Sequence, residues 1–244
     1  MNALITGNSA GLGLALTRCL LADGATVWGM SRRGCPLFDL HRDADDEHHA
    51  LRDRQQDLAH LTQIEDSLDR LLGDCLRLDL VILNAGLLGK IQDFASTDVH
   101  DLEMIMRVNA WANKVILDWL INRQLPVSQI VAISSGAAVN MHHGWGPYAL
   151  SKAALNQLIA LYAEEMPDSH LIAYAPGLVD TAMQTYISEE VNAEDYPSVA
   201  RLQTARGTSD MPDADTAART LLDHLQAFRQ QPSGAFIDIR HFKP

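Results

Sequence analysis

Two side chains able to exchange protons, Tyr148 and Lys152, stand four residues apart in the stretch SSGAAVNMHHGWGPYALSK, which covers residues 134–152. On a helix, that spacing puts both on one face, with their Cβ atoms about 6 Å apart. A free tyrosine, with a pKa of about 10, rarely loses its proton at neutral pH, and a nearby ammonium favours its phenolate form. The pair is therefore suited to general acid–base chemistry on an oxygen atom. An unrelated Tyr–Lys pair on an amphipathic helix is the alternative.

A second candidate site is the glycine-rich segment TGNSAGLG at residues 6–13, which lies between an apolar strand and a helical pattern. Glycine permits positive φ in a tight turn and lets a diphosphate approach where a Cβ would intervene. The following helix offers free N–H groups and a positive dipole end to phosphates. This context, with the spacing GxxxGxG, predicts dinucleotide binding rather than a plain structural turn. The candidate cofactor-binding residues here are Gly7, Ser9, Gly11, Leu12 and Gly13.

The end of the second predicted strand indicates which dinucleotide is bound. In this topology that strand end meets the adenosine ribose, where an acidic residue would bond the ribose hydroxyls and repel a 2′-phosphate. The chain has Ser31, Arg32 and Arg33 there instead. A guanidinium can hold a phosphate with two hydrogen bonds. These residues predict NADP(H) over NAD(H); the alternative is that both arginines are solvated loop charges.

A nicotinamide cofactor beside Tyr148 defines a reaction type. Hydride transfer to a carbonyl builds an alkoxide, so the site needs a proton donor close to that oxygen. Lowering the pKa of Tyr148 by about three units takes roughly 4 kcal/mol of differential stabilisation. A buried Lys152 and the positive charge of an oxidised nicotinamide are expected to supply it.

The elements that must position these residues alternate along the chain. Most strand patterns are continuously apolar, as in a parallel sheet buried on both faces. The sequence therefore predicts an α/β fold, a single Rossmann-type doubly wound parallel sheet with helices on both faces, forming one domain over residues 1–244. The predicted strands are Ala3–Thr6, Thr26–Met30, Leu80–Leu83, Gln129–Ile133, His170–Tyr174 and Ala235–Ile239, and Leu51–Gln56 is too polar to assign. The predicted helices are Leu12–Asp23, Leu61–Leu72, Leu102–Ile121, Tyr148–Glu165 and Asp215–Phe228.

Two segments break this alternation. Gly34–His49 is rich in Asp and His and is predicted to be a surface loop. Thr181–Pro212 contains helical fragments and follows a Pro-Gly pair. It is predicted to be a substrate lid, with an exposed connection as the alternative.

Composition limits the partners and the compartment. A net charge of −12 over 244 residues disfavours nucleic acid and anionic membranes as partners. Three widely spaced cysteines and an N-terminus without a signal-peptide pattern predict a reduced, cytoplasmic protein. The adjacent pairs His48-His49 and His142-His143 lack the spacing of a helical metal site, and no metal is expected. His142 and His143, which lie between Ser135 and Tyr148, are predicted to be plain loop residues, and the alternative is that one of them lines a substrate pocket.

Four features taken together resemble one family across essentially the whole chain. They are the segment TGNSAGLG, the turn Asn84-Ala85-Gly86, the set Ser135, Tyr148 and Lys152, and the segment Pro176-Gly177-Leu178-Val179-Asp180-Thr181. The combination resembles the short-chain dehydrogenase/reductases. Longer stretches, among them GWGPY at 144–148 and SGAFID at 233–238, are similar to the branch of sepiapterin reductases and benzil reductases. That branch is NADPH-dependent and reduces carbonyls, often vicinal diketones.

The resemblance implies a role for each matching residue. Tyr148 would be the general acid/base, Lys152 would lower its pKa and bind the nicotinamide ribose, and Ser135 would hydrogen-bond the substrate oxygen. Asn109 would hold a water that links Lys152 to solvent. The remaining cofactor contacts would come from Asp57 and Leu58 at the adenine, from Asn84, Ala85 and Gly86 beside the cofactor, and from Pro176, Gly177, Val179 and Thr181 at the nicotinamide end.

The function predicted from these features is an NADPH-dependent carbonyl reductase acting on a ketone or diketone. Two alternatives remain open: a nucleotide-binding regulatory protein of the same fold without physiological turnover, and an alcohol dehydrogenase working in the oxidative direction. The resemblance also implies a homodimer or homotetramer, because family members associate through the helix that carries Trp111 and Trp119 and through the Tyr148 helix.

Overall fold

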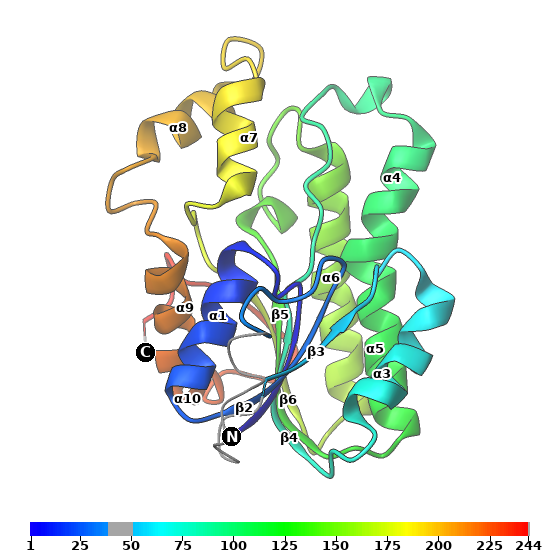
Figure 1. Ribbon diagram of the computed structural model, residues 1–244. Helices are drawn as coiled ribbons and strands as arrows, with labels where there is room; N and C mark the ends of the chain where they lie inside the picture. Colours follow the sequence, from blue (N-terminus) through cyan, green and yellow to red (C-terminus); the bar gives the residue numbers. More distant parts are fainter. Residues whose placement is uncertain (39–50, 244) are drawn as a thin grey trace.

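A single parallel sheet organises the computed structural model, which describes residues 1–38 and 51–243 (Figure 1). Its seven strands lie in the order β3-β2-β1-β4-β5-β6-β7. The strands are β1 (Asn2–Thr6), β2 (Thr26–Ser31), β3 (Leu51–Gln55), β4 (Leu78–Leu83), β5 (Val127–Ile133), β6 (His170–Ala175) and β7 (Ala235–Asp238). The predicted α/β doubly wound sheet is confirmed. Because β1 has β2 on one side and β4 on the other, the strand order reverses at β1, where such sheets bind ligands.

The polar segment that the sequence left unassigned is the edge strand β3. It pairs in parallel with β2, from Val27 opposite Leu51 to Ser31 opposite Gln55. Only Leu51 of this strand is buried. An edge strand packs little of its surface into the core, so it forms without the apolar run that marks the central strands.

Helices cover both faces of the sheet and form two cores. One face carries α1 (Gly11–Ala22), α9 (Ala214–Asp223) and α10 (Leu225–Phe228), and the other carries α3 (Ile64–Leu72), α4 (Val99–Met106), α5 (Ala112–Asn122) and α6 (Gly146–Glu165) (Figure 1). Leu16, Leu20 and Phe228 are fully buried in the first core, and Leu68, Ile116 and Leu155 in the second. The sheet is thus held rigidly, with its strand ends free to carry a site. No helix among residues 1–38 and 51–243 is long and apolar enough to span a bilayer.

The long helix predicted over Leu102–Ile121 is interrupted. Between α4 and α5, residues Arg107–Trp111 form a π-helical turn. Such turns insert one extra residue and are frequent at functional sites. Here the turn carries the buried Asn109.

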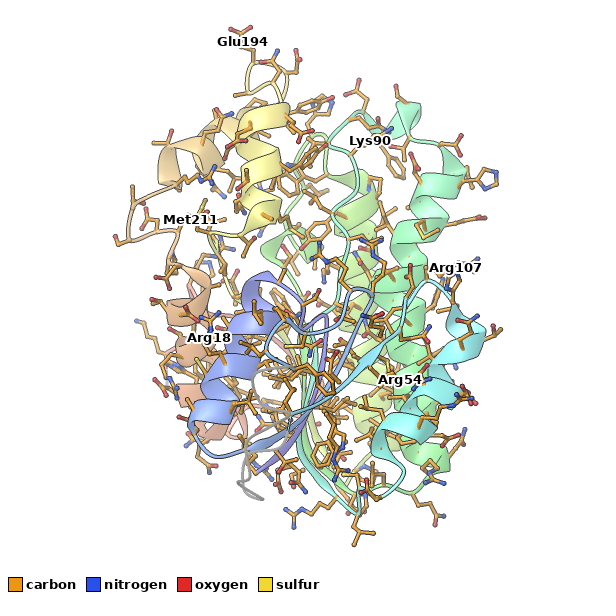
Figure 2. The ribbon with its side chains drawn as sticks, viewed as in Figure 1. Arg18, Arg54, Lys90, Arg107, Glu194 and Met211 are labelled. Atoms are coloured by element: carbon orange, nitrogen blue, oxygen red, sulfur yellow. The ribbon has the colours of Figure 1, made fainter. Side chains whose placement is uncertain are left out.

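The predicted lid contains two helices, α7 (Ala182–Glu190) and α8 (Pro197–Ala205), which stand above α1 and α9 and across from α4 and α6 (Figure 1). Figure 2 shows Glu194 at the tip between α7 and α8, and Met211 where the chain returns toward α9. Of the predicted loop Gly34–His49, residues 39–49 lie outside the described residues.

Candidate active site

A cavity of about 960 Å³ lies at the carboxyl ends of the strands. Every predicted cofactor-binding residue lines it, as do Ser135, Tyr148 and Lys152. Asn109 does not line it, and its Oδ1 lies 3.4 Å from where a Cβ on the lining residue Gly86 would stand. The structure therefore brings together residues that are spread from position 7 to position 181 of the chain.

The glycine loop has the geometry that its sequence predicts. Gly7 has φ +72°, and a Cβ on it would come within 2.8 Å of the Ala85 Cα. A Cβ on Gly13 would lie 2.3 Å from the Gly7 carbonyl oxygen. No larger residue fits at either position, so the loop stays close to the sheet and the start of α1 faces the cavity.

Four hydrogen bonds fix this loop to the end of β4. The Thr6 hydroxyl oxygen accepts from the backbone N–H groups of Asn84 and Ala85, at 3.0 and 3.1 Å. In return, Asn84 Nδ2 donates to the carbonyls of Thr6 (2.9 Å) and Gly7 (3.2 Å). These hydrogen bonds explain why the turn Asn84-Ala85-Gly86 accompanies the glycine loop. They join the ends of β1 and β4, the two strands at the reversal of strand order.

The end of β2 supplies the features that fit an adenosine phosphate. Ser31 is 3% exposed, and its buried hydroxyl oxygen has no hydrogen-bond partner within the described residues. Arg32 and Arg33 are exposed and line the cavity beside it. Asp57, which follows the neighbouring strand β3 and also lines the cavity, accepts from the backbone N–H of Ala59 at 2.9 Å and so caps its own turn. An unpaired buried hydroxyl is costly unless a ligand completes it, and a dinucleotide phosphate would do so. The residues present fit a phosphorylated dinucleotide.

Helix α6 holds the acid–base pair. It begins at Gly146-Pro147, and proline is favoured in a first helical turn because its fixed φ suits the helix and its missing N–H is not needed there. Tyr148 and Lys152 follow on one face, with exposed fractions of 9% and 3%. Lys152 Nζ lies 5.7 Å from the Tyr148 ring centroid and donates to the Ile133 carbonyl at 2.7 Å. The four-residue spacing therefore brings the ammonium beside the phenol, as predicted.

Burial sets the proton affinities of both groups. It raises the pKa of Tyr148 to about 12, although the hydroxyl of Ser135 acts in the opposite direction by hydrogen bonding. Burial also lowers the pKa of Lys152 to about 8. That Lys152 lowers the pKa of Tyr148 stays a prediction, because the net shift in this structure is upward. Desolvation of the phenol dominates, and the lysine ammonium, itself destabilised by burial, is not among the causes of the shift.

The Asn109 side chain connects two segments of this site by hydrogen bonds. Its side-chain oxygen accepts from Leu87 N–H at 2.7 Å, while Nδ2 donates to the Leu87 carbonyl (2.8 Å) and to Ser151 Oγ (2.9 Å). The Ser151 hydroxyl donates to the Tyr148 carbonyl at 2.8 Å. Asn109 thus ties the loop after β4 to the helix turn that holds Tyr148. Its role in holding a water stays a prediction, and its main-chain carbonyl already accepts from Asn113 Nδ2 at 2.8 Å.

The substrate end of the cavity includes residues that the sequence did not identify. An apolar cluster there combines Trp145 with Leu88 and Ile91 and with lid residues, Ile187 and Leu202 among them. Trp145 Nε1 donates to the lid residue Ser198 at 2.8 Å, which connects the lid to α6. Of the two histidines that the sequence weighed for the pocket, His142 lines the cavity, whereas His143 Nε2 lies 2.8 Å from Asp93 Oδ1. These apolar residues come from loops and from the lid helices α7 and α8, far apart along the chain, so only proximity in the fold identifies them.

The arrangement supports proton transfer at a carbonyl oxygen. The Tyr148 phenol holds its proton at neutral pH, because its pKa is raised, and can donate it to an oxygen in the cavity. Ser135 Oγ accepts from Ala137 N–H at 3.1 Å and lines the cavity beside Tyr148, so its hydroxyl can hydrogen-bond the same oxygen. The Lys152 ammonium lies beside the Tyr148 phenol and lines the same cavity, so it is placed to donate a hydrogen bond to a ribose. A bound nicotinamide would supply the hydride.

Comparisons with known proteins agree with this geometry. Residues 1–192 match the family model for short chain dehydrogenases. The chain is 30% identical to a benzil reductase ((S)-benzoin forming) of Bacillus subtilis, covering 98% of each chain. It is 32% identical to sepiapterin reductase of Rattus norvegicus over 66% of this chain and 62% of that one.

Solved structures show the same fold. A short-chain dehydrogenase/reductase from Saccharomyces cerevisiae superposes with a TM-score of 0.84 at 22% identity, covering 97% of this chain and 95% of that one. A short chain dehydrogenase from Burkholderia cenocepacia, in complex with NADP, superposes with a TM-score of 0.76, with the same identity and coverage. The chain therefore belongs to the short-chain dehydrogenase/reductase family, whose members use NAD(P)(H), and is an oxidoreductase acting on carbonyl and alcohol groups.

Proposed function

We propose that the protein is an NADPH-dependent carbonyl reductase that delivers hydride to a ketone or diketone, with Tyr148 as proton donor. The observation that carries the proposal is the convergence of Tyr148, Ser135 and Lys152 on one cavity whose other end holds Ser31 and Arg32. No member of the acid–base set is replaced. The apolar cluster around Trp145 favours a substrate with an aromatic or otherwise bulky group beside its carbonyl. The benzil and sepiapterin reductases among its relatives support this direction of reaction.

A substrate screen tests this proposal. Purified protein with NADPH would be mixed with 1-phenyl-1,2-propanedione, benzil and a quinone, and the loss of reduced-cofactor absorbance would be followed. We expect turnover of at least one vicinal diketone. Zero rates with all three, in protein that binds NADPH tightly, would refute the reductase and favour a nucleotide-binding regulator.

Replacing Ser31 by Asp and Arg32 by Ala together is expected to reverse the cofactor preference. The new carboxylate would repel a 2′-phosphate and bond ribose hydroxyls, while the phosphate would lose a charge-assisted partner. We expect the ratio of kcat/KM for NADPH to that for NADH to fall by about a hundredfold, since bonds to charged groups are worth more than neutral ones. Steady-state kinetics with both cofactors would measure the ratio. Arg229→Gln, an exposed change outside the cavity, is the control, and an unchanged ratio in the double variant would show that NADP(H) is not selected here.

Self-association is part of the same proposal. The elements α4, the π turn and α6 pack together and expose apolar side chains, among them Met104 (45%), Trp111 (43%) and Leu150 (48%). Trp119, in contrast, is buried and donates to Asp69 at 3.1 Å, so it belongs to the core. A homodimer or homotetramer would cover the exposed apolar side chains, and light scattering of the purified chain would measure its mass.

A further inference from the structure

The cavity carries charge of the opposite sign to the rest of the chain. The whole sequence has 31 Asp and Glu against 19 Lys and Arg. The only acidic residue described along the cavity wall is Asp57, at the adenosine end. The basic residues along it are Arg32, Arg33, Lys152, Arg201 and Arg240. Arg32 and Arg33 belong to the predicted phosphate site and Lys152 to the acid–base pair. Arg201 and Arg240 have no role in the function derived so far.

Arg240 is held in a fixed orientation next to the catalytic serine. Its Nε and Nη2 donate to the two carboxylate oxygens of Asp238, at 2.9 and 2.5 Å. Asp238 is itself only 8% exposed at its side chain, so the pair is anchored in the protein. Arg240 Nη2 comes within 2.5 Å of where a Cβ on Gly136 would lie, and Gly136 directly follows Ser135. The guanidinium therefore sits beside the serine that is expected to bind the reacting oxygen.

The ion pair with Asp238 leaves part of this guanidinium available. A guanidinium has five N–H groups, and the contact with Asp238 uses one on Nε and one on Nη2. The remaining edge, formed by Nη1 and the second N–H of Nη2, matches the two oxygens of another carboxylate. The Arg240 side chain is 38% exposed and lines the cavity.

Arg201 presents a second guanidinium from the lid. Ser198, Arg201 and Leu202 of α8 all line the cavity, and their spacing of three and four residues defines one helix face. Ser198 accepts from Trp145 Nε1, and Leu202 packs in the cluster that contains Trp145 and Tyr148. This face of α8 is therefore turned toward the substrate end. Arg201 is exposed and forms no ion pair within the described residues, whereas Arg206 contacts both Asp180 (3.4 Å) and Glu189 (3.7 Å).

We propose that Arg240 and Arg201 form a carboxylate subsite, and that the substrate class is an aromatic 2-oxo acid. This rests on the proposed reductase function and adds the group that the substrate must carry beside its carbonyl. Arg240 receives the carboxylate next to Ser135, Arg201 adds net positive charge from the lid, and the aromatic group packs against the Trp145 cluster. The oxo acid gains a hydride from NADPH at its carbonyl carbon and the Tyr148 proton at its oxygen, which leaves a 2-hydroxy acid and NADP⁺.

A matched pair of substrates tests the subsite. Benzoylformate and its methyl ester share the same reacting carbonyl and phenyl ring and differ in the negative charge. We expect the wild-type protein to have the higher kcat/KM for the acid. Arg240→Gln and Arg201→Gln should each lower kcat/KM for the acid by about tenfold to a hundredfold and change that for the ester by less than about threefold. The ester rate also reports whether each variant is folded.

Controls separate this proposal from the reductase function itself. Arg229→Gln removes the same charge at the end of α10, at the opposite end of the molecule from α8 (Figure 1), and should leave both rates unchanged. Reduction of the ester and of 1-phenyl-1,2-propanedione with no preference for the acid, or acid rates that survive both substitutions, would overturn the subsite and leave the reductase standing. Absence of turnover with every carbonyl tested would instead refute the reductase, and the subsite with it.

Binding of benzoate and benzamide to the NADPH complex gives a readout that needs no turnover. The two compounds have nearly the same shape, and only benzoate is charged. We expect benzoate to bind at least about tenfold more tightly than benzamide and to lose that advantage in Arg240→Gln. Equal affinities in the wild-type protein would overturn the carboxylate subsite.

Discussion

Replacement of Tyr148 by Phe is expected to lower kcat for diketone reduction by about a thousandfold, within the range that general acids contribute. The phenol is 9% exposed, and its pKa, raised to about 12, keeps the proton in place at neutral pH. Removing only the hydroxyl oxygen therefore removes the proton donor and little of the packing. We expect the Kd for NADPH to change by less than about twofold. Stopped-flow turnover and fluorescence titration of the cofactor would measure the two quantities.

A matched control exists on the same helix. Tyr162 of α6 is also buried, at 6% exposure, but its hydroxyl donates to Asp118 and it does not line the cavity. Tyr162→Phe should leave kcat within about threefold of the wild-type value. Turnover that persists in Tyr148→Phe would mean that another group donates the proton, and the proposed role of Tyr148 would be wrong.

Replacement of Lys152 by Met is expected to change activity and stability in opposite directions. Turnover should fall by about a hundredfold or more, since the ammonium beside the phenol and its ribose contact are lost. At pH 7, however, the free energy of unfolding should rise by about 2 kcal/mol. The pKa of Lys152 falls from 10.5 to about 8 on burial, which corresponds to about 3 kcal/mol of destabilisation of the charged form, and the lost bond to the Ile133 carbonyl offsets about 1 kcal/mol of that.

The pH dependence of this stability follows from the lowered pKa. Between pH 8 and pH 10.5 the unfolded chain binds a proton at Lys152 that the folded chain does not hold, so wild-type stability contributed by this group rises with pH across that window. Lys152→Met is therefore more stable than the wild type by the full amount below pH 8, and this difference vanishes by about pH 10, where only the lost bond to the Ile133 carbonyl remains. Urea unfolding at pH 7 and pH 10 would measure it.

An exposed lysine provides the comparison. Lys114 is half-exposed and pairs with Asp118 at 2.5 Å, so Lys114→Met should change the free energy of unfolding by less than about 1 kcal/mol. If Lys152→Met proved less stable than wild type at pH 7, the burial of this ammonium would not be the destabilising element inferred here. A gain in stability at the expense of turnover would instead identify Lys152 as a residue retained for function.

The amino-acid sequence by itself determined the parts of this protein that depend on local spacing. The order TGNSAGLG after an apolar strand predicts the phosphate-binding loop, because the glycine positions and the helix start lie within eight residues. The four-residue interval from Tyr148 to Lys152 likewise predicts their shared helix face. The continuous apolar runs of the central strands predict a parallel sheet, since both faces of those strands are buried.

Tertiary structure alone decided the features that depend on burial and on distant neighbours. The edge strand β3 forms through its register with β2 and carries no apolar pattern of its own. The pKa of Tyr148 rises because the folded chain removes the phenol from water, and the spacing from Tyr148 to Lys152 gives no sign of this burial. Arg240 reaches Gly136 from about a hundred residues away. Desolvation and proximity are properties of the assembled fold, so no pattern along the chain specifies them.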